Sequence, residues 1–157
     1  KKHGVAFNNN KELAVNLKCT RKPVHAVFTQ KKADKLGFDE GLMLDIKGNV
    51  ATCNSTNFFI VRGKEVWTST GEYCLPGVTR ENIINICKEN SIDVYEKDFL
   101  MESVHSSDEA FVTGTFAGVI PVIEVDGHKI SEGKRGEVTS SLQNLYLDLI
   151  SLECEND

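Results

Sequence analysis

The sequence predicts an α+β fold, a mixed sheet packed against helices. Short apolar runs bounded by turn residues recur through the middle of the chain, which is typical of strands. Glycine-containing pairs at Gly63-Lys64 and Asp126-Gly127 separate some of these runs as hairpin turns would. Apolar residues at helical spacing occupy three further segments, 23–36, 79–89 and 137–152.

Each predicted helix carries its own signals. Pro23 is tolerated in a first helical turn, and Gly37 follows the last apolar residue of that segment. Ile83, Ile86 and Cys87 share one face of the second helix. The last helix repeats apolar residues on one face, and a short helix or turn is expected at 101–107.

The predicted strands are shorter. Residues 1–16 indicate irregular chain or an isolated strand. The next apolar runs are joined by tight turns, which predicts an antiparallel meander of strands at 41–45, 50–52, 58–61 and 65–69. Later strands are expected at 91–98, 109–113, 119–125 and 129–130, the last two forming a hairpin.

Composition narrows the class of protein. The chain has 157 residues, which suits one domain, and is 40% hydrophobic and 26% charged, which is ordinary globular composition. A net charge of -5 argues against nucleic acid as a partner. No run of 18 apolar residues occurs, so no membrane-spanning helix is expected.

Cysteine usage indicates the redox environment. The chain has 5 cysteines at wide spacings, with no C-x-x-C pair. Structural metal sites favour close pairs, so we expect no metal. Reduced thiols are typical of the cytoplasm or an organelle matrix, and we expect the protein there.

Two segments are candidates for binding an anion. Gly77-Val78-Thr79-Arg80 opens a predicted helix, where free N–H groups favour a phosphate. Thr79 could equally serve as an ordinary N-cap. Thr113-Gly114-Thr115 ends a predicted strand, where glycine permits close approach of a ligand or simply makes a turn. Neither segment matches a Walker loop or a dinucleotide fingerprint.

Taken together, several motifs resemble the class IV pyridoxal-phosphate (PLP) aminotransferases, in particular the branched-chain and D-amino-acid aminotransferases. The resemblance covers about residues 18–150 and preserves both order and spacing. The motifs that carry it are Asp39-Glu40-Gly41-Leu42-Met43-Leu44-Asp45, Gly48-Asn49-Val50, Asn57-Phe58-Phe59-Ile60-Val61, Leu75-Pro76-Gly77-Val78-Thr79-Arg80, Asp108-Glu109-Ala110-Phe111-Val112-Thr113-Gly114-Thr115, Pro121-Val122 and Asp126-Gly127.

The resemblance implies a fold and a reaction. Residues 1–157 would form the larger, PLP-binding domain of a D-amino-acid-aminotransferase-like protein, a mixed sheet and helices arranged as a pseudo-barrel. Such enzymes transfer an amino group from an amino acid, here branched-chain, to a 2-oxo acid through a lysine Schiff base. Family members carry a smaller N-terminal domain, which would be absent from residues 1–157, and they are usually homodimers.

The resemblance also implies roles for individual residues. Ungapped register places the Schiff-base lysine at Lys18, with Lys22 as the nearest rival. Thr115 and Phe116 would contact the substrate. Residues expected to bind the cofactor are Thr52, Gly77, Val78, Thr79, Gly114 and Thr115.

Two positions depart from the family pattern. Thr52 stands where aminotransferases of this family have a glutamate that keeps the pyridine nitrogen protonated. Pro23 stands where a tyrosine often contacts the cofactor's phenolic oxygen. Two alternatives therefore stay open beside transamination: a PLP-dependent lyase resembling aminodeoxychorismate lyase, and a catalytically impaired PLP-binding or scaffold protein.

Other polar residues are not assigned to a site. The histidines His3, His25, His105 and His128 are dispersed in the sequence with no partner pattern, which favours surface or hydrogen-bonded histidines over a catalytic base. Asp108 and Glu109 are adjacent in a predicted strand, so their side chains should point to opposite faces.

Overall fold

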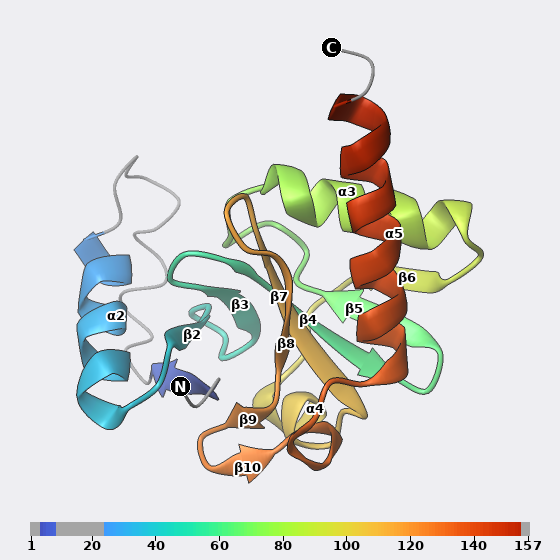
Figure 1. Ribbon diagram of the computed structural model, residues 1–157. Helices are drawn as coiled ribbons and strands as arrows, with labels where there is room; N and C mark the ends of the chain where they lie inside the picture. The colour runs from blue at the N-terminus through green and yellow to red at the C-terminus, as the bar shows by residue number, and fades with distance from the viewer. Residues whose placement is uncertain (1–3, 9–23, 155–157) are drawn as a thin grey trace.

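The computed structural model describes residues 4–8 and 24–154, which form two five-stranded sheets with helices on their outer sides (Figure 1). The first sheet has the order β10-β9-β1-β2-β3, with strands β1 (Gly4–Asn8), β2 (Glu40–Leu44), β3 (Val50–Cys53), β9 (Glu124–Val125) and β10 (His128–Lys129). The second has the order β6-β5-β4-β7-β8, with strands β4 (Asn57–Arg62), β5 (Glu65–Thr68), β6 (Asp93–Glu96), β7 (Glu109–Gly114) and β8 (Gly118–Val122). The mixed α/β class predicted from the sequence is confirmed.

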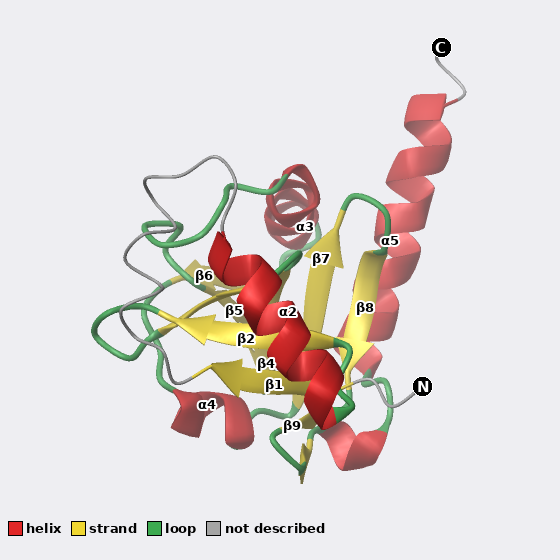
Figure 2. Ribbon diagram, turned by 90° about the vertical axis from the view of Figure 1, so that its left-hand side faces the viewer, coloured by secondary structure: helices red, strands yellow, loops and turns green. Residues whose placement is uncertain are grey.

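The helices are α2 (Val24–Leu36), α3 (Val78–Glu89), α4 (Met101–His105) and α5 (Glu137–Cys154), with a short 3-10 helix, η1 (Ser131–Gly133). Figure 2 shows α2 lying across β1 and β2, and the helix contacts both strands. Helices α3 and α5 pack against each other and against β7. In the described part of the chain, no helix is both long and apolar enough to cross a membrane.

The single antiparallel meander predicted for residues 41–69 is wrong. Strands β2 and β3 pair antiparallel in the first sheet, and β4 and β5 pair antiparallel in the second. The chain changes sheets at residues 54–56, where the backbone N–H of Cys53 donates to the Thr56 carbonyl at 3.0 Å. Both flanking strands are almost fully buried, so neither shows the polar alternation that would have revealed its sheet.

The N-terminal strand is also more central than the sequence indicates. Strand β1 lies between β2 and β9 and runs parallel to both. The single strand predicted at 119–125 is divided, because β8 belongs to the second sheet and β9 to the first. The hairpin turn itself is confirmed, since β9 and β10 pair antiparallel around Asp126 and Gly127, whose φ angles are 50° and 83°. Both values suit the left-handed turn that this pair of residues favours.

Strands β4 and β7 separate two hydrophobic cores. Phe58 and Ile60 face the core shared with the first sheet, whereas Phe59 and Val61 face the core beneath α3 and α5. Phe59 stacks on Phe111 of β7 with ring centroids 4.8 Å apart. This double-sided burial fixes the register of β4 and β7, at whose ends the candidate site lies.

Candidate functional site

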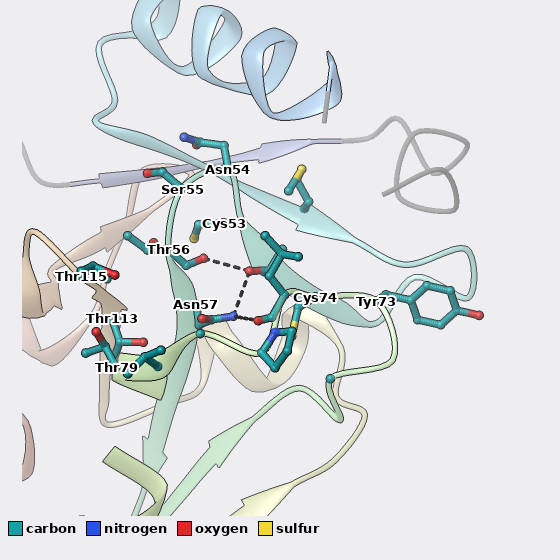
Figure 3. A pocket seen from close by; sticks show the side chains of 18 of the residues that line it. Cys53, Asn54, Ser55, Thr56, Asn57, Tyr73, Cys74, Thr79, Thr113 and Thr115 are labelled. Carbon is teal, nitrogen blue, oxygen red and sulfur yellow. Dashed lines mark hydrogen bonds between the residues drawn. The ribbon is translucent and has the colours of Figure 1, made fainter. Parts of the chain in front are cut away.

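A pocket of about 480 Å³ opens where the first turn of α3 meets the β3–β4 connection and the end of β7 (Figure 3). It is lined by Met43 and by three segments, residues 52–57, 71–79 and 113–115. All of the residues predicted to bind the cofactor line it: Thr52, Gly77, Val78, Thr79, Gly114 and Thr115. The two candidate anion segments, far apart in the sequence, therefore meet in one cavity.

We call one side of this pocket the helix end, formed by residues 77–79 and 113–115. Helix α3 begins after Gly77, and no side chain of the described residues caps it. A Cβ at Gly77 would collide with the side-chain oxygen of Asn57, so glycine is required here for space. The amides of the first turn have no acceptor within the helix and carry its partial positive charge, which favours an anion.

Thr79 is not the N-cap that the sequence left open as an alternative. The cap position is Gly77, and Thr79 lies inside the helix, 3% exposed. Its Oγ1 lies 3.5 Å from the Tyr146 hydroxyl of α5. The pocket wall here is therefore held by contacts between α3 and α5.

The end of β7 supplies the rest of the helix end. A Cβ on Gly114 would approach Thr56 Cγ2 to 3.1 Å, which explains a small residue at this point. Thr115 is exposed at the pocket rim. Phe116, expected to contact substrate, has an exposed side chain in the β7–β8 turn and does not line the pocket.

A second part of the lining, formed by residues 52–57 beside the helix end, is called the β3–β4 end. The Thr52 hydroxyl donates to the Thr56 carbonyl at 2.8 Å, and the Asn57 amide donates to the Leu75 carbonyl at 3.0 Å. Glu40 accepts hydrogen bonds from the hydroxyls of Ser55 and Thr56. These donors are thus engaged with other protein groups.

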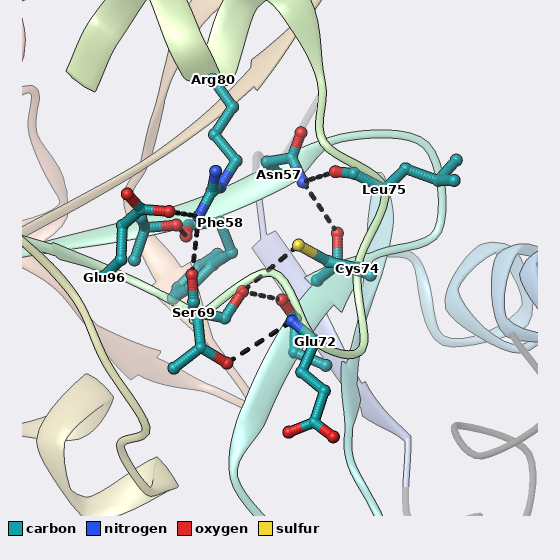
Figure 4. A network of polar contacts seen from close by, with 12 residues as sticks. Asn57, Phe58, Ser69, Glu72, Cys74, Leu75, Arg80 and Glu96 are labelled. Carbon is teal, nitrogen blue, oxygen red and sulfur yellow. Dashed lines mark hydrogen bonds and ion pairs between the residues drawn. The ribbon is translucent and has the colours of Figure 1, made fainter. Parts of the chain in front are cut away.

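A buried arginine joins α3 to the strands beside the pocket (Figure 4). Arg80, 6% exposed, donates from Nη2 to the Ser69 carbonyl and to Glu96, both at 2.7 Å. Ser69 in turn donates from its hydroxyl to the Ala51 carbonyl at 2.6 Å. The sequence analysis assigned Arg80 no role in the site, although its position directly after Thr79 in the candidate anion segment could have indicated one.

The pocket carries little formal charge on its described lining. Glu72 is the charged side chain among those lining residues. Burial, followed by the nearby Glu40 carboxylate, raises the pKa of the Cys53 thiol well above its usual value, so this thiol stays neutral. Lys18, Lys22 and Pro23 lie outside the described residues.

Two other predictions concern groups away from the pocket. Glu109 accepts hydrogen bonds from the Val138 and Thr139 amides of α5, whereas Asp108 accepts one from the Gly63 amide. The two adjacent side chains therefore contact different parts of the molecule, as expected. His105 and His128 are both exposed, as expected for surface histidines, and their rings stack with centroids 4.5 Å apart. Within the described ranges, no cluster of three metal-ligating side chains occurs.

Comparisons with known proteins agree with this geometry. The branched-chain-amino-acid aminotransferase of Pseudomonas aeruginosa is 38% identical over 146 residues, covering 90% of this chain and 48% of that protein. A probable one from Aquifex aeolicus is 35% identical over 129 residues, covering 81% and 42%. The chain thus spans about half the length of the curated relatives it matches.

Solved structures give the same result. The branched-chain amino acid aminotransferase of Escherichia coli superimposes with a TM-score of 0.83 at 29% identity, covering 91% of this chain and 50% of that one. An aminotransferase from Brucella abortus, solved with its cofactor PLP, gives 0.74 at 33% identity, covering 79% and 44%. The profile of the Amino-transferase class IV family matches residues 6–125, and the chain belongs to that family.

Proposed function

We propose that this protein is a PLP-dependent aminotransferase that moves an amino group from a branched-chain amino acid to a 2-oxo acid. The observation that carries the proposal is the helix end of the pocket, which gathers uncapped α3 amides and threonine hydroxyls around one cavity. The branched-chain assignment rests on relatives: one neighbouring branched-chain amino acid aminotransferase was solved with 4-methylvaleric acid, a branched carboxylic acid.

The residues present fit the phosphate of such a cofactor. The first-turn amides of Val78 and Thr79 would donate to it, as would the Thr115 hydroxyl at the rim. Gly77 and Gly114 keep the cavity free of side chains that would fill it. Bound PLP supplies an electron sink that stabilises negative charge on the substrate carbon.

The lysine and the larger assembly remain parts of the proposal. Lys18 would hold the cofactor and move the proton at the substrate α-carbon, as sequence register suggests. Residues 1–157 would act as the larger domain, working with a smaller N-terminal domain and in a homodimer. Leu75 and Val78, 74% and 70% exposed beside the pocket, are apolar surface that such a partner would cover.

One observation favours a second candidate, a PLP-dependent lyase or a catalytically impaired PLP-binding protein. Thr52 carries no charge, and its hydroxyl proton is already donated to the Thr56 carbonyl. It therefore offers nothing that would keep a pyridine nitrogen protonated, as a carboxylate does. This second candidate shares the cofactor and differs in the chemistry that follows.

A labelling experiment tests the proposal. The protein is incubated with PLP, reduced with borohydride and mapped by mass spectrometry, and we expect the label on Lys18. Lys18→Ala should lose the label and lower transamination by about a thousandfold or more, whereas Lys22→Ala should retain both. A label on Lys22 would refute the assignment of Lys18. If no lysine were labelled, the proposal that the protein is a PLP-dependent enzyme would be refuted.

A further inference from the structure

One polar group at the helix end plays no part in the proposed function. Thr113, on β7, is 1% exposed, and its Oγ1 has no hydrogen-bond partner in the part of the chain that the structure describes. Its strand neighbours are Asn57 on β4 and Val119 on β8. Neither gives this hydroxyl a partner, although the residue lines the pocket.

An unpaired buried hydroxyl is costly, because it loses its bonds to water and gains none in return. Valine has nearly the same shape as threonine and would avoid this cost. A threonine at position 113 is therefore explained if its hydroxyl finds an acceptor only when a ligand occupies the pocket. Such a ligand has to present an acceptor atom at the helix end.

The surroundings identify the acceptor as an anion. Thr113 lies in β7 and Thr115 follows directly after that strand, and both residues line the pocket. Figure 3 shows both of them with Thr79 on one side of the pocket. The uncapped N-terminus of α3 adds partial positive charge to the same place.

We propose that Thr113 is a cofactor-binding residue whose hydroxyl donates to the phosphate of PLP, alongside the Thr79 and Thr115 groups. This inference rests on the proposed function and deepens it. A phosphate has several acceptor oxygens, so it can accept from a third hydroxyl. The hydroxyl then has opposite effects in the two states: it destabilises the free protein and strengthens phosphate binding.

The test is Thr113→Val, compared with wild type by thermal unfolding and by binding of PLP and of pyridoxal, which lacks the phosphate. Without ligand, the variant should unfold roughly 2–4 °C higher, because an unpaired buried hydroxyl is gone. Its affinity for PLP should fall about tenfold, equivalent to about 1.4 kcal/mol. Its affinity for pyridoxal should stay the same.

Two further variants keep the result interpretable. Thr139→Val removes another buried hydroxyl that has no partner among the described residues, at a position outside the pocket lining. It should raise the unfolding temperature and leave PLP affinity unchanged. Thr113→Ser keeps the hydroxyl and should retain most of the PLP affinity.

The outcomes separate this inference from the proposed function. Equal PLP affinity for wild type and Thr113→Val would overturn the inference alone. Equal losses for PLP and pyridoxal, or a loss in Thr113→Ser as large as in Thr113→Val, would mean that shape matters rather than the hydroxyl, and would also overturn it. A wild-type protein that binds no PLP would overturn the proposed function and the inference together.

Discussion

The two ends of the pocket differ in whether their polar groups already have partners. At the helix end, α3 starts without a side-chain cap, and the buried Thr113 hydroxyl has no partner within the described ranges. At the β3–β4 end, Thr52 and Asn57 both donate to backbone carbonyls. Donors at the helix end therefore lack acceptors, whereas Thr52 and Asn57 at the other end already have them.

This difference has an energetic meaning. A ligand that brings acceptors to the α3 amides and the Thr113 hydroxyl displaces water and breaks no hydrogen bond described within the protein, so the net interaction favours binding. A ligand that seeks a donor from Thr52 must first displace the Thr56 carbonyl, so the net gain is small. We expect binding to depend mainly on the helix end and the rate of chemistry to respond to the β3–β4 end.

The largest effect is expected at Arg80, which ties α3 to the strands beside the β3–β4 end. Arg80→Met removes hydrogen bonds to Ser69 and Glu96 and should lower the free energy of unfolding by about 2–3 kcal/mol. PLP affinity should fall as well, because the first turn of α3 loses its anchor. Urea denaturation and PLP titration measure both effects.

Arg135→Met is the matched control. Arg135 is exposed and donates to Gln143, so its replacement should change stability by less than about 0.5 kcal/mol. If Arg80→Met were equally harmless, the two ends of the pocket would be independent of this connection.

The next effect concerns chemistry at the β3–β4 end. Thr52→Glu introduces a carboxylate that can keep a pyridine nitrogen protonated, and we expect the first half-reaction to be about tenfold faster. Because position 52 is 8% exposed and faces a carbonyl, the ligand-free variant should also be less stable. Single-turnover kinetics with a panel of amino acids gives the rate.

Thr52→Gln separates charge from size, since glutamine matches glutamate in shape without its charge. It should give no acceleration. A wild-type protein that is already fast, together with a slower Thr52→Glu, would show that Thr52 serves other chemistry and would support the second candidate.

The smallest effect is alkaline destabilisation through buried thiols. Burial raises the pKa of Cys87 from 9.0 to about 11, and that of Cys53 at the β3–β4 end rises as well. The folded protein therefore holds these protons more tightly than the unfolded chain. The resulting stability is fully present below pH 9 and is lost as pH rises toward 11.

For Cys87 this loss amounts to about 1 kcal/mol by about pH 10. Urea unfolding at about pH 8 and about pH 10 should show it, and Cys87→Ala should reduce the difference between the two pH values. Cys154→Ala, at an exposed thiol, controls for the loss of one cysteine. An unchanged pH difference in Cys87→Ala would show that this thiol is not responsible.

Local sequence patterns were enough to predict the kinds of element and to mark residues 77–80 and 113–115 as two candidate anion-binding segments. The helical spacing of Ile83, Ile86 and Cys87 indicates which face of α3 is buried. Only the family resemblance, which rests on the order and spacing of the motifs, predicted that residues 77–79 and Thr115 belong to the same site.

Which polar groups are satisfied depends on the packed chain and could not be predicted from any local pattern. The change of sheet between β3 and β4, the central place of β1, the bond from Thr52 to Thr56 and the Thr113 hydroxyl without a described partner all belong here. The physical reason is that a hydrogen bond depends on the distance between two atoms once the whole chain has packed. Arg80 and Glu96, 16 residues apart, become partners because α3 packs beside the strand order β6-β5-β4, and nothing in either segment alone requires it.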